Sequence, residues 1–482
     1  MDTTTRRSTS RRLIAAAGAA ALTLAGVLAA AVPASAAPGN LPTGGGTLTI
    51  HKFEQPSTAG PLDNSGTPLP QGTTSAWVAL SGVNFTIQPI TDVDLTTNAG
   101  WDLAAGYAKN PSTATKLGAA TTVATGSDGS VKTTLALGAY LVTEVASPHA
   151  TIVGSGAAAH ITMTAAPFVV TVPIPTDNGT WNSDVHVYPK NSLSNVTKSV
   201  AAPSGNGLGS TLTWTIDVKI PYLTAGQAFT GFDILDALDA KLAYVAGSAA
   251  AKIGTTSVVL TDTTKGQNVA LSPAKLDVLA ANQGKTLSVT FSTTVITAGE
   301  IDNKASVYIN NPQHTDPVVS NPTASYWGRI SITKHALGDE TKTLQGAQFA
   351  VYASQDDANG DANRISVGGA NTFTTGPDGT VVIPGLFVSN EASKTKTYYV
   401  KEVAAPAGYQ LNATVFPATL TANGDVATPV ALTVADAQQP QLALPITGGD
   451  GAVTLTVLGA GLLLVALGVA VVAARRRRRA QH

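Results

Sequence analysis

The chain carries the same series of strand-like segments twice. Residues 47–54 (TLTIHKFE) and 328–335 (GRISITKH) each open a series that continues with a Gly-containing strand and an Asp-Gly turn. Each series closes on a strand that runs from Tyr to Glu, GAYLVTEVASP (138–148) and TYYVKEVAAPAGY (397–409). Asp-Gly pairs favour hairpin turns because both residues tolerate positive φ. The repeat therefore predicts two copies of one β-sandwich.

A different unit with strand-like alternation separates the two copies. It runs from SNVTKSV (194–200) to IDNKASVYINN (301–311), and its breaks fall near Asn191 and Tyr326. We predict an all-β fold of tandem sandwiches, with domains at 37–191, 192–326 and 327–440. The sequence contains no cysteine, so these domains lack the disulfides that usually stabilise small exported domains.

The N-terminal segment has the features of an export signal. Arginines precede a short Ala-rich apolar run, and Ala34, Ser35 and Ala36 form a small-residue cleavage site. We predict a signal peptide over residues 1–36 rather than a retained membrane helix. The pair Arg11-Arg12 also fits a twin-arginine signal, so the general and the twin-arginine export routes both stay open.

The C-terminal segment, residues 441–482, combines a short motif, an apolar stretch and a basic tail. Residues 451–474 carry no charge and are long enough to span a bilayer as a helix, and five arginines follow at 475–479. The motif before them resembles the LPXTG sorting signal of Gram-positive surface proteins; it consists of Leu444, Pro445, Ile446, Thr447 and Gly448. A sortase would cut between Thr447 and Gly448; the alternative is a plain single-pass anchor.

Lysines and acids occupy positions where strand alternation places apolar side chains. Residues two apart share a face of a strand, and this puts one lysine of each domain among apolar residues: Lys52, Lys198 and Lys334. Acids on apolar faces follow the same rule: Glu144, Asp236 and Glu402. A buried lysine and a buried acid are costly unless they pair, and burial favours their neutral forms.

A neutral lysine is a nucleophile, and a protonated acid can polarise an amide carbonyl. With a third residue the set could form an intramolecular isopeptide bond. We predict Lys52 with Asn191 through Glu144, Lys198 with Asn303 through Asp236, and Lys334 with Asp436 through Glu402. Asn321 is a rival to Asn303, and buried salt bridges or lysines that reach solvent are the alternative.

The stretch WNSDVHVYPKN (181–191) resembles the pilin motif of sortase-assembled pili, and YYVKEVAAPAGY resembles the E-box of the same proteins. With the sorting signal, they make the chain similar to a major shaft pilin of the type-2 fimbrial kind. The resemblance implies Ig-like domains of the collagen-adhesin A and B types. It also implies that a class C sortase joins Thr447 of one subunit to Lys190 of another. Alternation predicts that Lys190 faces outward and Asn191 inward.

The same resemblance implies the partners and the location of the chain. Identical subunits, tip or basal pilins, the pilus sortase, and a housekeeping sortase with peptidoglycan are the expected partners, and no residue pattern names a host receptor. The expected location is the cell wall, reached from a transient membrane-bound precursor. The alternatives are a monomeric wall-anchored adhesin and a minor pilin at the base or tip.

Other functions have weak support. A net charge of −1 argues against nucleic acid as a partner. No turnover enzyme and no cofactor are expected, since no Ser-His-Asp set is apparent. The histidines show no metal-ligand spacing, so we expect no metal. Residues 357–363 (DANGDAN) are spaced like the opening of a calcium loop but lack its glycine, and a polar turn is the preferred interpretation.

Overall fold

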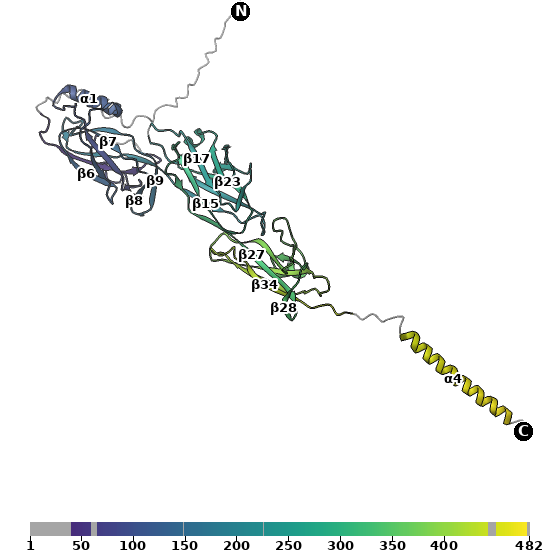
Figure 1. Cartoon of the computed structure of the whole chain (residues 1–482). Helices are drawn as coiled ribbons and strands as arrows, with labels where there is room; N and C mark the ends of the chain where they lie inside the picture. Colours follow the sequence, from purple (N-terminus) through teal and green to yellow (C-terminus); the bar gives the residue numbers. More distant parts are fainter. Residues whose placement is uncertain (1–39, 59–64, 148, 225, 442–449, 480–482) are drawn as a thin grey trace, which may run out of the picture.

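The structure is a computed structural model that describes residues 40–58, 65–147, 149–224, 226–441 and 450–479. Strands dominate, and β-sandwiches follow one another in a row along the chain (Figure 1). The all-β prediction is confirmed. The predicted signal peptide and the motif at 444–448 lie outside the described residues.

The first sandwich packs two sheets around a core that contains Leu48, Phe85 and Val142. One sheet has the order β13 (Asp184–Val187), β1 (Gly46–His51), β6 (Ser130–Leu135). The facing sheet has the order β10 (Phe168–Val172), β7 (Gly138–Glu144), β4 (Asn84–Pro89), β5 (Thr121–Ala124). A further sheet in this domain has the order β2 (Phe53–Glu54), β14 (Lys190–Ser194), β9 (Ala158–Met163), β8 (His149–Ile152), β3 (Leu80–Ser81). A separate two-stranded sheet is formed by β11 (Ile174–Pro175) and β12 (Trp181–Asn182).

The second sandwich has a core that contains the fully buried side chains of Trp214, Phe232 and Phe291. Its first sheet has the order β15 (Val196–Val200), β16 (Thr211–Lys219), β23 (Thr286–Val295), β19 (Ala250–Ile253), β20 (Thr256–Val258), with β18 (Leu242–Tyr244) also on β23. Its second sheet has the order β21 (Leu260–Asp262), β22 (Asn268–Pro273), β17 (Phe232–Ala237), β25 (Ala305–Ile309), β26 (Val318–Val319).

The third sandwich is built on one long strand, β27 (Thr323–Ala336). Its partners are β24 (Gly299–Asn303), β28 (Asp339–Thr343), β31 (Thr380–Ser389) and β34 (Val430–Asp436). The facing sheet has the order β30 (Phe373–Thr374), β29 (Gln348–Tyr352), β32 (Thr395–Ala404), β33 (Val415–Thr421). Because β27 pairs with β24 of the second sandwich and with β31 of the third, it runs unbroken from one core into the next.

The repeat seen in the sequence is also a repeat of topology. Strand β1 is antiparallel to β6, which follows the Asp-Gly turn, and parallel to the late strand β13. Strand β27 is likewise antiparallel to β31 and parallel to the late strand β34. In both copies the opening strand therefore lies beside a strand from the end of its domain.

Short helices also lie between strands of the sandwiches, and the sequence patterns did not predict them. They are α1 (Asn98–Lys109), the 3-10 turn η2 (Pro111–Thr113), α2 (Asp277–Ala280) and α3 (Gln355–Gly360), and the chain continues into α4 (Asp450–Arg479). Thr97 caps α1 by accepting a hydrogen bond from the Gly100 amide at 3.1 Å. The helix packs Ala104 into a small apolar cluster with Ile90 and Leu95, beside the main core.

No helix within the described residues is both long and apolar enough to be a candidate membrane span. The predicted span over 451–474 lies partly outside the residues whose side chains are described, so it stays a prediction.

The junction between the second and third sandwiches depends on Trp327. Its side chain is fully buried in the second core, and its ring lies 5.4 Å from that of Phe387 of β31.

We predict that Trp327→Ala lowers the free energy of unfolding by about 3–5 kcal/mol, as expected for a large side chain removed from a core. Calorimetry on the chain from residue 37 to 447 measures it. Leu337→Ala, at a position 68% exposed, is the control; equal stability of the two variants would contradict this role.

Candidate functional site: buried lysine clusters and an acceptor lysine

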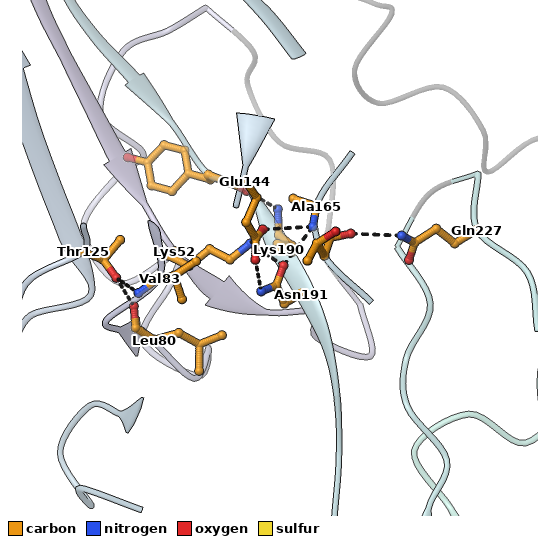
Figure 2. A network of polar contacts seen from close by, with 11 residues as sticks. Lys52, Leu80, Val83, Thr125, Glu144, Ala165, Lys190, Asn191 and Gln227 are labelled. Carbon is orange, nitrogen blue, oxygen red and sulfur yellow. Dashed lines mark hydrogen bonds and ion pairs between the residues drawn. The ribbon is translucent and has the colours of Figure 1, made fainter. Parts of the chain in front are cut away.

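The first sandwich encloses a lysine, an acid and an amide in mutual contact (Figure 2). Lys52 follows β1, Glu144 ends β7 and Asn191 lies in β14. The Lys52 Nζ atom lies 2.5 Å from Asn191 Oδ1 and 2.7 Å from Glu144 Oε2. Asn191 Nδ2 donates to Glu144 Oε1 at 2.6 Å. The Ala165 amide donates to both acceptors, at 3.0 Å to Glu144 Oε2 and 2.9 Å to Asn191 Oδ1.

The first cluster is sealed from water. The side chains of Lys52 and Glu144 have no exposed surface, and the Lys52 Nζ atom lies 5.5 Å from the centre of the Phe85 ring. Burial lowers the pKa of Lys52 to about 8, against the opposing attraction of the Glu144 carboxylate. The amine therefore gives up its proton far more readily than a lysine in water.

The second sandwich brings Lys198 of β15 against Asp236 of β17 as a fully buried ion pair. Aromatic rings line this pocket, with the Lys198 Nζ atom 5.0 Å from the Trp214 ring and 5.5 Å from the Phe291 ring. Burial lowers the pKa of Lys198 to about 8 and raises the pKa of Asp236. Both shifts favour the neutral forms of the pair.

The structure separates the two asparagines considered for the second cluster. Asn303 is 2% exposed, and its amide is near enough to Asp236 to influence the pKa of that carboxyl. Neither side-chain polar atom of Asn303 has a hydrogen-bond partner among the described residues. Asn321 instead pairs with the main chain of Lys198, accepting from its N–H at 2.8 Å and donating to its carbonyl at 2.9 Å. Only Asn303 thus places its amide inside the pocket.

The third sandwich holds one lysine between two acids. Lys334 of β27 contacts Asp436 Oδ1, and its Nζ atom lies 3.2 Å from Glu402 Oε1; none of these side chains has exposed surface. Parallel pairing of β27 with β34 sets the contact, since Lys334 lies opposite Val434, two residues before Asp436. Burial raises the pKa of Glu402 to about 7, although the Asn412 amide donates to its Oε2 at 2.8 Å.

Lys190 differs from the expectation that alternation gave. Asn191 does point inward and is fully buried, but the neighbouring Lys190 is half-buried instead of open. Its Nζ atom lies 4.7 Å from the centre of the Trp77 ring and donates to the Tyr188 carbonyl at 3.1 Å. Burial alone lowers the pKa of Lys190 to about 8. The sequence analysis missed Trp77 because it comes from a loop more than a hundred residues away.

Trp77, which contacts this lysine, also lines a surface hollow of about 220 Å³. Trp77 and residues 54–58 line one part of it, and Lys219 and Tyr222 of the second sandwich line another. Lys219 also pairs with Glu54 across the junction, at 2.6 Å. Trp77 thus contacts the lysine amine and the hollow together. The predicted acyl donor, Thr447, lies outside the described residues.

The turn at 357–363 satisfies its own polar groups. The Asp361 carboxylate accepts from Arg364 at 2.6 and 2.7 Å, and Asp357 accepts from Asn363 at 2.7 Å. A calcium ion would need the Asp361 carboxylate as a ligand, but Arg364 already binds it. This contact supports the interpretation of residues 357–363 as a polar turn.

Comparisons with known proteins identify two segments of the chain. Residues 44–192 match the model of the Gram-positive pilin subunit D1, N-terminal domain, and residues 328–432 match that of a prealbumin-like fold domain. The chain is 32% identical to the fimbrial subunit type 1 of Actinomyces viscosus and 30% identical to the fimbrial subunit type 2 of Actinomyces naeslundii. Each alignment covers 90% of both chains.

A solved structure supports the fold. The full-length major pilin SpaD from Corynebacterium diphtheriae is similar with a TM-score of 0.65 and 23% identity, covering 83% of this chain and 99% of that one. The two chains therefore share the same overall fold.

We predict that the Trp77 ring keeps water from Lys190. In Trp77→Ala the pKa of Lys190 should rise from about 8 toward the ordinary lysine value of about 10.4. The lost cation–π contact acts in the opposite direction, but at about 0.5–1 kcal/mol it corresponds to less than one pKa unit. NMR titration of lysine side chains measures the shift. Trp101→Ala, which removes an indole that contacts Trp181 instead, is the control; an unchanged Lys190 pKa in Trp77→Ala would contradict the shielding.

Proposed function

The chain belongs to the fimbrial subunits of Gram-positive bacteria, and from that premise we propose that it is a shaft pilin whose subunits are joined covalently and whose domains crosslink themselves. As a member of this family it is a structural subunit of a surface pilus. The observation that carries the finer proposal is the burial, in each sandwich, of a lysine against an acid and an amide or second acid.

The crosslinking step in the first two domains is a transamidation. In the first, Lys52 passes a proton to Glu144, and the neutral Nζ attacks Asn191 Cγ while the protonated acid hydrogen-bonds to the amide oxygen. The C–N bond to the asparagine nitrogen breaks, that nitrogen takes the proton of the acid and leaves as ammonia, and the attacking Nζ returns one of its two protons to the carboxylate. The lowered pKa of Lys52 and the 2.5 Å separation of its Nζ atom from Asn191 Oδ1 support this step. Lys198, Asp236 and Asn303 act in the same way in the second domain.

The third domain uses an acid where the others use an amide. Lys334 passes one proton to Asp436, and its neutral Nζ attacks Asp436 Cγ. Glu402 gives its proton to the departing hydroxyl, which leaves as water, and takes one proton back from the attacking nitrogen as the amide forms. A pKa near 7 for Glu402 supports this role, because a group with such a pKa exchanges protons readily at neutral pH. The bond would tie the first strand of the sandwich, β27, to its last, β34.

Polymerisation uses Lys190 and Thr447. A class C sortase would hold Thr447 as an acyl-enzyme after releasing Gly448, and the neutral Lys190 amine of another subunit would attack that carbonyl. The product is an amide between subunits, and the sortase thiol is freed. A lysine pKa near 8 keeps a useful fraction of the amine neutral at physiological pH. A housekeeping sortase would finally join the fibre to peptidoglycan, which places it on the cell wall.

We predict that Lys190→Arg abolishes the covalent ladder of pilin multimers in cell-wall extracts. Arginine keeps a cation over Trp77 but cannot accept the acyl group, so loss of the ladder reports chemistry and not folding. Lys219→Ala removes a neighbouring lysine of the same junction and should leave the ladder intact. A ladder that persists in Lys190→Arg would favour a non-polymerised adhesin or a different acceptor.

We predict that Glu402→Gln prevents the third-domain bond. The variant should retain the water that the wild type loses, as measured by intact mass. It should also lose about 4–5 kcal/mol of unfolding free energy, the chain-entropy value for a crosslink that closes about a hundred residues. Lys334 and Asp436 are 102 apart in sequence. Glu391→Gln, at an exposed acid, is the control; water loss in Glu402→Gln would remove Glu402 from the reaction.

A further inference from the structure

Two histidines of the first sandwich and an aspartate of the second form a cluster that the sequence analysis missed. The members are His149, His160 and Asp316, and one potential ligand atom from each lies within 4.8 Å of the others. The His149 Nε2 atom is 3.7 Å from Asp316 Oδ1, and the two imidazole rings are 5.3 Å apart, edge to face. The expectation that the histidines lack metal-ligand spacing holds along the chain but not in space.

Strand register brings the histidines together. His149 of β8 lies directly opposite His160 of β9 in an antiparallel pair, so both side chains point to the same face of the sheet. Strand β9 lies next to the second sandwich in Figure 1. The sheet therefore presents two imidazoles close to the neighbouring domain.

Asp316 reaches the same place from the loop between β25 and β26. The loop turns tightly, with Asn310, His314 and Asp316 at φ values of 53°, 50° and 55°. Internal contacts hold it: the Asn311 side chain donates to the Thr315 carbonyl, and His314 Nε2 lies 3.0 Å from Asp233 Oδ2. The carboxylate position is thus set by the second domain's own structure.

Direct contacts between the domains fix the two halves of the cluster relative to each other. Asn310 Nδ2 contacts Met163 Sδ at 3.1 Å, at the end of β9. Gln227 donates to the Thr164 carbonyl at 3.0 Å, a contact drawn beside Ala165 in Figure 2. Met163 ends β9 and Thr164 follows it, so both contacts join the second domain to the chain just after His160.

The donor set indicates the kind of ion. Two imidazole nitrogens and one carboxylate oxygen suit zinc and similar transition-metal ions, whereas calcium and magnesium prefer oxygen ligands alone. His160 is half-buried, whereas His149 and Asp316 are exposed, so the site is reachable from solvent. Three protein ligands leave a fourth tetrahedral position for water.

We propose that His149, His160 and Asp316 bind a divalent transition-metal ion of the zinc class, which bridges the first and second domains. Small side-chain rotations would bring the ligand atoms to coordination distance, since the side chains of His149 and Asp316 are exposed and only the backbone of the Asp316 loop is held. The bound ion links the domains of one subunit at a place where the isopeptide bonds, each within a single domain, provide no connection.

Titration of the metal-free chain, residues 37–447, with zinc by calorimetry tests the proposal. We expect one ion per chain, at least tenfold weaker binding in His160→Ala, and a similar loss in Asp316→Asn. Cobalt should give the visible absorption of a tetrahedral site, and this absorption should disappear in both variants. Asp302→Asn, at an exposed aspartate of the second domain outside the cluster, is the matched control.

The outcomes distinguish an ion that bridges the two domains from an ion that is bound by the first domain alone. Unchanged affinity in Asp316→Asn with loss in His160→Ala would overturn the bridge and leave a histidine pair confined to the first domain. Absence of saturable zinc binding, or equal binding by wild type and both variants, would overturn the site. Circular dichroism of each variant verifies that it is folded, so a loss of binding is assigned to the ligand removed.

Discussion

The structure depends on lysines buried against carboxyl groups inside β-sandwiches. An unpaired ammonium in such an interior is strongly destabilising, and pairing with a carboxylate only partly offsets the cost of removing both from water. Lys52 and Lys334 nevertheless have no exposed side-chain surface. In the proposed chemistry each lysine becomes an amide nitrogen and the acid that promotes the reaction ends protonated, so a costly ion pair becomes a neutral, covalently linked cluster.

The buried lysine clusters compensate for the absence of disulfides and for the low aromatic content of the chain. The chain has no cysteine and few aromatic residues, and the sandwiches form a slender row (Figure 1). In each copy of the repeat, the lysine at the opening strand faces a residue near the end of the domain. A bond there connects the two ends of the domain, so a pull along the fibre would pass through the crosslink before it could unzip the sheets. Strand β27 continues from the second core into the third, so it would carry a pull across the junction between these two domains.

Strand alternation was sufficient to predict the buried charged residues, because the face on which each one lies depends only on its own strand. It identified Lys198 and Asp236 because a charged residue in phase with apolar neighbours must lie inside. It could not predict contacts that depend on loops or on domain packing. Trp77 over Lys190 comes from a distant loop, and Asp316 joins the histidines only through the contact between domains.

The central claim is that each buried lysine becomes an amide, and the intact mass of the purified chain from residue 37 to 447, followed by peptide mapping, tests it most directly. The account predicts a mass lower than the sequence mass by two molecules of ammonia and one of water, with Lys52 linked to Asn191, Lys198 to Asn303, and Lys334 to Asp436. An unmodified mass would contradict the claim and leave the three clusters as buried ion pairs. A linkage to Asn321 would contradict the assignment in the second domain.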